Sequence, residues 1–216
     1  MDKKKGAILC NAAIVIFSVV GLYLSASKGI PLFPYYTQNS NLLAGIAALL
    51  LIIFLLTKKD MNEVPGWVLI LKFTSVFMLS VTFLVVAFLL VPQSVLSGGS
   101  WQWWYFFIGD SMLFTHTLNP IVAVISFIFF ENDRRFNKKK TIWYPLAVTL
   151  IYGIAMLVIN YLNIFKGPYF FFMVHDVKWY TVVLCFIGIL AGSYLVARFL
   201  LIENQKRLRR RKRYQS

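Results

Sequence analysis

The sequence predicts an all-α, polytopic membrane protein with six transmembrane helices, and two observations lead to that prediction. The 216 residues are 59% apolar with a mean hydropathy of +0.71, whereas soluble domains are closer to half apolar. The apolar residues also gather in blocks of about 20, the length that a helix needs to cross about 30 Å of hydrocarbon. A single transmembrane domain over residues 1–216 accommodates all six blocks.

Turn-forming and charged residues separate the six expected spans. Pro31 and Pro34 break the chain before the second span, because proline lacks the backbone donor and clashes with the preceding turn. Pro65 and Gly66 mark the next turn, and residues 92–104 form an expected loop whose Trp101, Trp103 and Trp104 are typical of an interfacial aromatic belt. The spans are expected at about residues 7–24, 36–56, 67–91, 106–130, 143–162 and 180–202.

Three features inside the spans carry their own expectations. Lys72 lies near the start of the third span, where its stem can lie in lipid while its amine reaches the interface. Gly188 and Gly192 form a small-xxx-small pair, which indicates a close helix contact within the bundle. Cys10 and Cys185 both lie in apolar runs and are expected to behave as small hydrophobes, with no disulfide or metal spacing.

The distribution of charge predicts the orientation in the membrane. The chain has a net charge of +14, and 17 of its 22 Lys and Arg fall at the start, after the second span, after the fourth span and after the sixth. Six spans place all of these segments on one side, which the positive-inside rule makes cytoplasmic, together with both termini. The basic tail, residues 203–216, is expected to anchor this topology and to touch anionic headgroups. Because the charge follows topology, nucleic acid is not an expected partner.

Polar residues gather at the heads of the second and fourth spans. The stretch FPYYTQNSNLL carries Thr37 and Asn41, and the stretch DSMLFTHTLNP carries Asp110, His116 and Asn119. An ionisable side chain at membrane depth is costly and is therefore a candidate for a functional site. On the expected topology both stretches lie at the outer side, together with His175 and Asp176 of the last loop.

These residue types are the minimum for acyl transfer on a lipid ester. A threonine hydroxyl, Thr37, becomes a nucleophile when a base such as His116 takes its proton. Asn41, Asn119 or backbone N–H groups could hold the developing oxyanion. Asp110, His175 and Asp176 are supporting candidates that would orient the base or close the mouth of the site. Asp110 and His116 lie six residues apart, about 120° round a helix, and are poor direct partners.

Ordinary structural roles remain open for the same residues. Thr37 could be an N-cap, and His116 could be a hydrogen-bonded packing residue between helices. Asp110 could sit in the first turn of its helix because of the helix dipole. His175 and Asp176 could be an ordinary polar pair in a loop.

The same stretches resemble a known family. FPYYTQNSNLL, THTLNP and the segment GPYFFFMVHDV before the sixth span are similar to the androgen-induced/FAR-type family of multipass membrane proteins and its bacterial six-span relatives. The resemblance implies a threonine hydrolase that acts on fatty acid esters of hydroxy fatty acids, with Thr37 and His116 as its pair and no cofactor. It also implies the cell membrane of a bacterium as the location.

Three hypotheses about function follow. The first is an intramembrane hydrolase of a lipid ester with a membrane lipid or fatty acyl ester as substrate and neither cofactor nor metal. The second is a non-catalytic membrane protein that carries or binds a lipid or solute. The third is a structural partner of a larger complex, which would copurify with another subunit.

Overall fold

The computed structural model describes residues 2–58, 61–98, 103–167 and 169–213. Over these residues it contains helices and turns and no strand, and six helices are long and apolar enough to cross a membrane. The all-α, six-span architecture expected from the sequence is therefore confirmed at this level. Trp101 of the expected aromatic belt, Pro168 of the stretch GPYFFFMVHDV and residues 214–216 of the basic tail lie outside the described residues.

The helices follow the apolar blocks, because a backbone in hydrocarbon must satisfy its own hydrogen bonds. Their bounds are α1 Lys3–Ser27, α2 Tyr36–Thr57, η1 Met61–Glu63, α3 Gly66–Val85, η2 Val86–Leu90, α4 Val91–Leu96, α5 Tyr105–Ile108, α6 Asp110–Met112, η3 Leu113–Leu118, α7 Asn119–Phe129, η4 Arg134–Asn137, η5 Lys139–Ile142, α8 Trp143–Tyr161, η6 Phe170–Phe172 and α9 Trp179–Arg213.

The third span is longer than expected because Pro92 does not end it. α3 passes through a π-helical turn, η2, into α4, and the span reaches Leu96. Pro92 comes just after the π-helical turn η2, where the hydrogen-bond register of the helix already changes, so its missing backbone donor does not end the helix. The expected loop therefore begins after Leu96 and not at Pro92.

The fourth span starts later than expected. Gly109 and Asp110 separate the short helix α5 from α6, and Asp110 has a positive φ of 42°. A Cβ at Gly109 would lie 2.5 Å from the Tyr105 ring, so only glycine fits this break. Residues 106–109 therefore form a separate turn against the span, which itself runs from Asp110 to Phe129.

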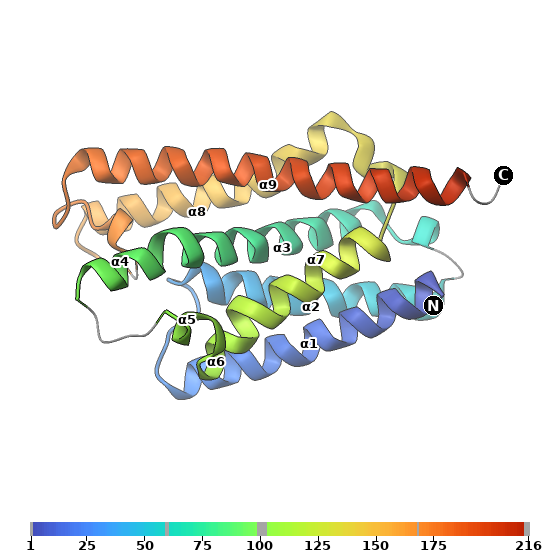
Figure 1. Cartoon of the computed structure of the whole chain (residues 1–216), viewed down its shortest axis with the longest axis horizontal. Helices are drawn as coiled ribbons and strands as arrows, with labels where there is room; N and C mark the ends of the chain where they lie inside the picture. The colour runs from blue at the N-terminus through green and yellow to red at the C-terminus, as the bar shows by residue number, and fades with distance from the viewer. Residues whose placement is uncertain (1, 59–60, 99–102, 168, 214–216) are drawn as a thin grey trace.

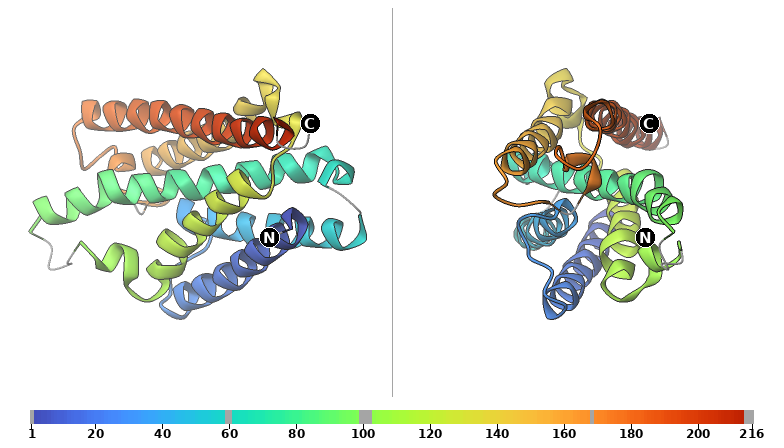
Figure 2. Two further views of the ribbon diagram at one scale, coloured as in Figure 1. Left: turned by 45° about the vertical axis from the view of Figure 1, so that its right-hand side comes forward. Right: turned by 90° about the vertical axis from the view of Figure 1, so that its left-hand side faces the viewer.

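α3 lies at the centre of the bundle (Figure 1), in contact with α2, α7, α8 and α9. α1, α2 and α7 lie on one side of it, and α8 and α9 lie on the other (Figure 2). α1 begins and α9 ends at the same end of the bundle. The start of α2, the short helices α5 and α6 and the start of α9 lie at the opposite end.

Lys72 is buried, so the expectation that it snorkels to the interface is wrong. Only 1% of its side chain is exposed, and its Nζ lies 3.8 Å from Oε1 of Glu131, which is equally buried. The same Oε1 accepts hydrogen bonds from Asn11 Nδ2 at 2.6 Å and from Ser126 Oγ at 2.5 Å. A charge inside a bundle is tolerated when it faces another helix and finds a counter-charge, and Glu131 at the end of α7 supplies one.

Candidate functional site

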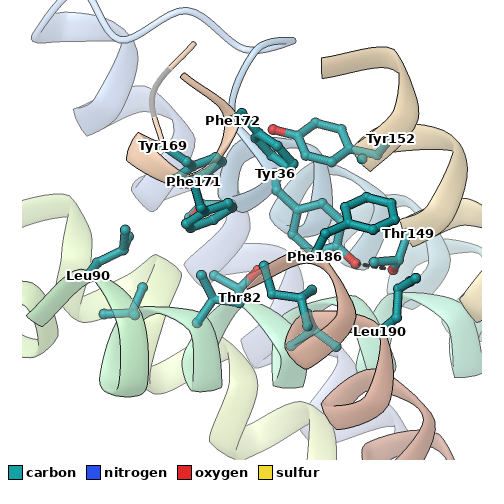
Figure 3. Close-up of a pocket in the computed structure, with 16 residues that line it drawn as sticks. Tyr36, Thr82, Leu90, Thr149, Tyr152, Tyr169, Phe171, Phe172, Phe186 and Leu190 are labelled. Atoms are coloured by element: carbon teal, nitrogen blue, oxygen red, sulfur yellow. Dashed lines mark hydrogen bonds between the residues drawn. The ribbon is translucent and has the colours of Figure 1, made fainter. Parts of the chain in front are cut away.

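A small cavity lies between α2, α3, α8 and α9, with η6 over it (Figure 3). Its lining includes the first residues of α2, which begins at the end of the bundle opposite the termini (Figure 1). Its volume is about 40 Å³, which is room for a few atoms and not for a whole lipid chain. Its walls are aromatic and aliphatic, and threonine hydroxyls supply most of the remaining polar groups. The six aromatic side chains are Tyr36, Tyr152, Tyr169, Phe171, Phe172 and Phe186, and the threonines are Thr37, Thr82 and Thr149.

Most hydroxyls around the cavity have partners that fix them in place. Tyr36 Oη lies 2.7 Å from Thr149 Oγ1, and Tyr152 Oη donates to the carbonyl of Pro34 at 2.7 Å. Thr82 Oγ1 lies 3.1 Å from Ser40 Oγ. Because a buried hydroxyl without a partner is costly, these bonds hold the aromatic walls rigid.

Thr37 occupies the second position of α2 and lines the cavity. The N-cap of α2 is Tyr35, whose side chain makes no capping hydrogen bond, so the expected alternative of Thr37 as the N-cap is wrong. The first backbone N–H groups of a helix have no partner within it. Thr37 thus lies at the positive end of a helix dipole, where the backbone N–H groups of Tyr36 and Thr37 bond the phenol of Tyr169.

Tyr169 contacts the Thr37 side chain from the loop before α9. Burial raises the pKa of its phenol, while hydrogen bonds with Thr37 and Tyr36 act in the opposite direction. With the pKa raised, the phenol is protonated at neutral pH and acts as a donor. Tyr169 packs edge-on against Phe172 and stacks on Phe171, so the segment η6 closes the cavity above Thr37.

Asn41 and Asn119 join α2 to the fourth span. Asn41 Nδ2 donates to the carbonyl of Thr37 at 2.8 Å and to that of Thr115 at 3.2 Å. Asn41 Oδ1 accepts a hydrogen bond from Asn119 Nδ2 at 2.7 Å. The same Asn119 Nδ2 lies 3.0 Å from Ser18 Oγ. The donors of Asn41 and Asn119 are thus held within the bundle, whereas the N–H groups at the start of α2 bond the Tyr169 phenol at the cavity, which an oxyanion could replace.

His116 lies in the π-helical turn η3 and is 5% exposed. Its Nδ1 lies 2.8 Å from the carbonyl of Phe106 in α5. A carbonyl can only accept, so Nδ1 carries the proton and Nε2 of the neutral ring is an acceptor. π-helical turns occur frequently at functional sites, and this one presents a histidine in the tautomer of a general base.

Thr37 and His116 lie on neighbouring elements, α2 and η3. Among the described residues, no hydrogen bond joins their side chains. His116 is not one of the residues that line the cavity. The link between them runs through Asn41, which bonds the backbones of Thr37 and of Thr115, the neighbour of His116. Gly21 of α1 allows η3 to lie this deep, since a Cβ there would be 2.8 Å from Thr115 Cγ2.

The other three candidates from the sequence lie away from the cavity. Asp110 forms an ion pair with Lys28 and accepts a hydrogen bond from Tyr105 Oη at 3.3 Å. Asp176 pairs with Lys166 at 2.9 Å. The Nε2 of His175 lies 3.0 Å from the carbonyl of Tyr161, and the His175 ring stacks on that tyrosine. Each therefore has a local partner, and none contacts His116 or Thr37 by a bond in the described part of the chain.

A larger apolar groove adjoins the cavity on the lipid-facing side. It lies between α3 and α9, has a volume of about 530 Å³ and shares Val81, Val85 and Ile189 with the cavity. Gly188 and Gly192 line it, and a Cβ at either would meet nothing within 4 Å. The expectation of a close helix contact at this glycine pair is therefore wrong within the chain, and the pair keeps the groove open.

The sequence alone gave the aromatic residues around Thr37 no role in the site. Tyr36 is the neighbour of Thr37, and Tyr169, Phe171 and Phe172 belong to the stretch GPYFFFMVHDV. Both stretches stand out in the sequence, but nothing in it indicates that these aromatic side chains line a cavity. Thr149 and Tyr152 of α8 had no signal in the sequence, because a threonine and a tyrosine in an apolar run are common. Comparisons with protein-family models, with curated proteins and with solved structures found no match for this chain.

Proposed function

We propose that this chain is a multipass membrane enzyme that hydrolyses or transfers the acyl group of a lipid ester, with Thr37 as nucleophile and His116 as base. The observation that carries the proposal is the position of Thr37. Its side chain lines a small aromatic cavity at the start of α2, and the cavity adjoins a larger apolar groove open to lipid. The groove suits an acyl chain, and the cavity suits the ester that the chain carries.

The reaction would proceed in two steps, acylation of Thr37 and then hydrolysis of the acylated threonine. Thr37 Oγ1 attacks the ester carbonyl while its proton passes to His116 Nε2, and the oxyanion takes the place of the Tyr169 phenol at the N–H groups of the first turn of α2. The C–O bond of the ester then breaks, and the imidazolium gives its proton to the departing alcohol. Water releases the acyl group from Thr37 in a second round with the same base. The carbonyl of Phe106 holds Nδ1–H throughout.

This mechanism requires a movement that closes the remaining gap between the two side chains. Catalytic hydrogen bonds often form only when substrate is bound, and η3 is joined to α2 through the Asn41 bridge. The likeness of FPYYTQNSNLL and THTLNP to the androgen-induced/FAR-type family supports the same pair. A fatty acid ester of a hydroxy fatty acid is the substrate class that this likeness favours.

A long-chain alkyl fluorophosphonate tests the proposal. We expect it to label the purified protein at Thr37, and we expect Thr37→Ala and His116→Ala each to reduce labelling at least about 100-fold, the usual scale for loss of a general base or nucleophile. Thr37→Ser should retain part of the labelling. Thr57→Ala at the far end of the same helix and His175→Ala in the last loop are matched controls that should label as the wild type does.

A specific observation also favours the second hypothesis, a lipid-binding or carrier protein. No His, Asp or Glu is among the described residues that line the cavity, so a bound lipid would meet hydroxyls and aromatic rings but no charged base. In that case the wild type would stay unlabelled by the fluorophosphonate while still retaining lipid on purification. Full labelling of His116→Ala would likewise exclude the proposed base.

We also propose that both termini are cytoplasmic and that the membrane is the cell membrane of a bacterium. The start of α1 and the end of α9 lie at one end of the bundle (Figure 1). The strongly basic segments of the sequence belong to that end, as the positive-inside rule requires for the cytoplasmic side. The cavity then lies in the outer half of the membrane.

A further inference from the structure

A second concave site lies at the opposite end of the molecule from the cavity. It is a pocket of about 620 Å³ between η4, η5 and the first residue of α8 on one side and the second half of α9 on the other. The segment between α7 and α8 lies against α9 in both views (Figures 1 and 2). The pocket shares no lining residue with the Thr37 cavity.

All of the charged residues that line this pocket are cationic. Lys138, Arg198, Lys206 and Arg209 line it, and no Asp or Glu is among the described lining residues. Lys206 is paired with Glu203 at 2.6 Å. Lys138, Arg198 and Arg209 form no ion pair with any residue that the structure describes. Three basic side chains therefore converge on one pocket without a counter-ion, which favours an anionic ligand.

The spacing along α9 gives the pocket depth. Arg198, Gln205 and Arg209 are separated by seven and four residues, so they follow one face of the helix. Arg198 and Arg209 are eleven residues apart, which is about 16 Å along the axis at 1.5 Å per residue. Arg209 thus lies toward the aqueous end of α9, and Arg198 lies deeper, with its guanidinium 5.9 Å from the centre of the Tyr194 ring.

Apart from Asn137 and Gln205, the remaining lining is aromatic or aliphatic. Ile142 and Trp143 approach from the start of α8, and Leu201 and Ile202 approach from α9. A soluble anion would not need an apolar wall of this kind. A lipid would need both a cationic end and an apolar wall.

We propose that this pocket binds one anionic phospholipid, with its phosphodiester between Lys138 and Arg209 and an acyl chain along Trp143 and Ile202. Arg198 lies beside the acyl chain, and its side chain extends toward the glycerol and phosphate oxygens, as long basic side chains do at a membrane interface. Basic pockets between transmembrane helices at the cytoplasmic side are suited to anionic headgroups. The site is independent of the proposed chemistry at Thr37. It also gives a specific place for the contact that we expect between the basic tail and anionic headgroups.

Native mass spectrometry of the full chain in detergent tests the site. We titrate with dioleoyl phosphatidylglycerol and, separately, with dioleoyl phosphatidylcholine, and we expect the anionic lipid to bind at least about tenfold more tightly. The double variant R198Q/R209Q should weaken phosphatidylglycerol binding about 30-fold, since each basic residue contributes about a factor of five. R210Q is the matched control, because Arg210 is exposed on the same helix and does not line the pocket.

The charge-conserving variant R198K/R209K protects the test against misfolding, because it keeps both cations and should retain most of the binding. Equal binding of the two lipids would overturn the proposal. An equal loss in R210Q and R198Q/R209Q would also overturn it, because the attraction would then be spread over the surface. Full displacement of the lipid by millimolar inorganic phosphate would show a site for soluble anions and would overturn the choice of a lipid.

Discussion

At the scale of single residues, the buried ion pair between Lys72 and Glu131 is the most consequential feature outside the two sites. Both side chains are 1% exposed, and the Nζ of Lys72 and the Oε2 of Glu131 have no hydrogen-bond partner among the described residues. A buried pair contributes little net stability, because desolvation offsets the attraction, but removal of one partner strands a charge.

Lys72→Met should therefore destabilise the protein by about 3–5 kcal/mol, as is usual when one member of a buried pair is removed. The double variant K72M/E131Q should recover most of that loss, because no charge remains to be stranded. Unfolding in detergent, followed by circular dichroism against a denaturing detergent, would measure both. Lys166→Met is the matched control: its pair with Asp176 is exposed, and its effect should stay below about 1 kcal/mol.

At the scale of elements, the segment η4 holds the turn between α2 and α3. Arg135 Nη1 and Nη2 donate to the carbonyls of Val64 and Met61 at 2.6 and 3.0 Å, and Asp133 accepts from Arg135 Nε at 2.8 Å and from its Nη2 at 2.7 Å. Burial of Asp133 opposes its ionisation, yet the hydrogen bonds and charge of Arg135 prevail and lower the pKa of the carboxyl.

A lowered pKa in the folded state means that Asp133 stabilises the fold above its unfolded pKa of about 3.9 and loses this contribution as the pH falls through the folded value. Asp133→Asn should thus lower the melting temperature at pH 7 and reduce the further loss between pH 5 and pH 3. Melting curves at each pH would measure this difference. Asp176→Asn, in the exposed pair with Lys166, should leave the wild-type pH dependence largely in place.

Local sequence patterns predict the number of membrane spans in this protein but not where two of the spans begin or end. Six spans were predictable, because a block of about 20 apolar residues has few alternatives in lipid. The continuation through Pro92 and the break at Asp110 were not, because both depend on neighbours. Pro92 follows a π-helical turn, and Gly109 fits against the ring of Tyr105. The burial of Lys72 depended on Glu131, which is 59 residues away in sequence.

At the scale of the whole molecule, the candidate site was only partly predictable. The heads of the second and fourth spans were found, and the structure joins them through Asn41 and Asn119. Spacing could not show that Thr37 would face a cavity or that His116 would bond the carbonyl of Phe106, since those facts depend on how three separate elements pack. The assignment of Thr37 and His116 as a catalytic pair stays a prediction.

The arrangement of groove and cavity leads to a prediction about the path of the substrate. Gly188→Leu adds a side chain where a Cβ meets nothing within 4 Å, so it should fill the groove without disturbing the fold. A fluorophosphonate with a hexadecyl chain should then label Thr37 at least about tenfold more slowly, since several buried methylenes lose their site at about 0.8 kcal/mol each. An ethyl fluorophosphonate does not need the groove and should react at the wild-type rate. Gly66→Leu, at an equally open position near the other end of α3, should leave both rates unchanged. Equal slowing of the short and long probes in Gly188→Leu would mean that the groove is not the route to Thr37.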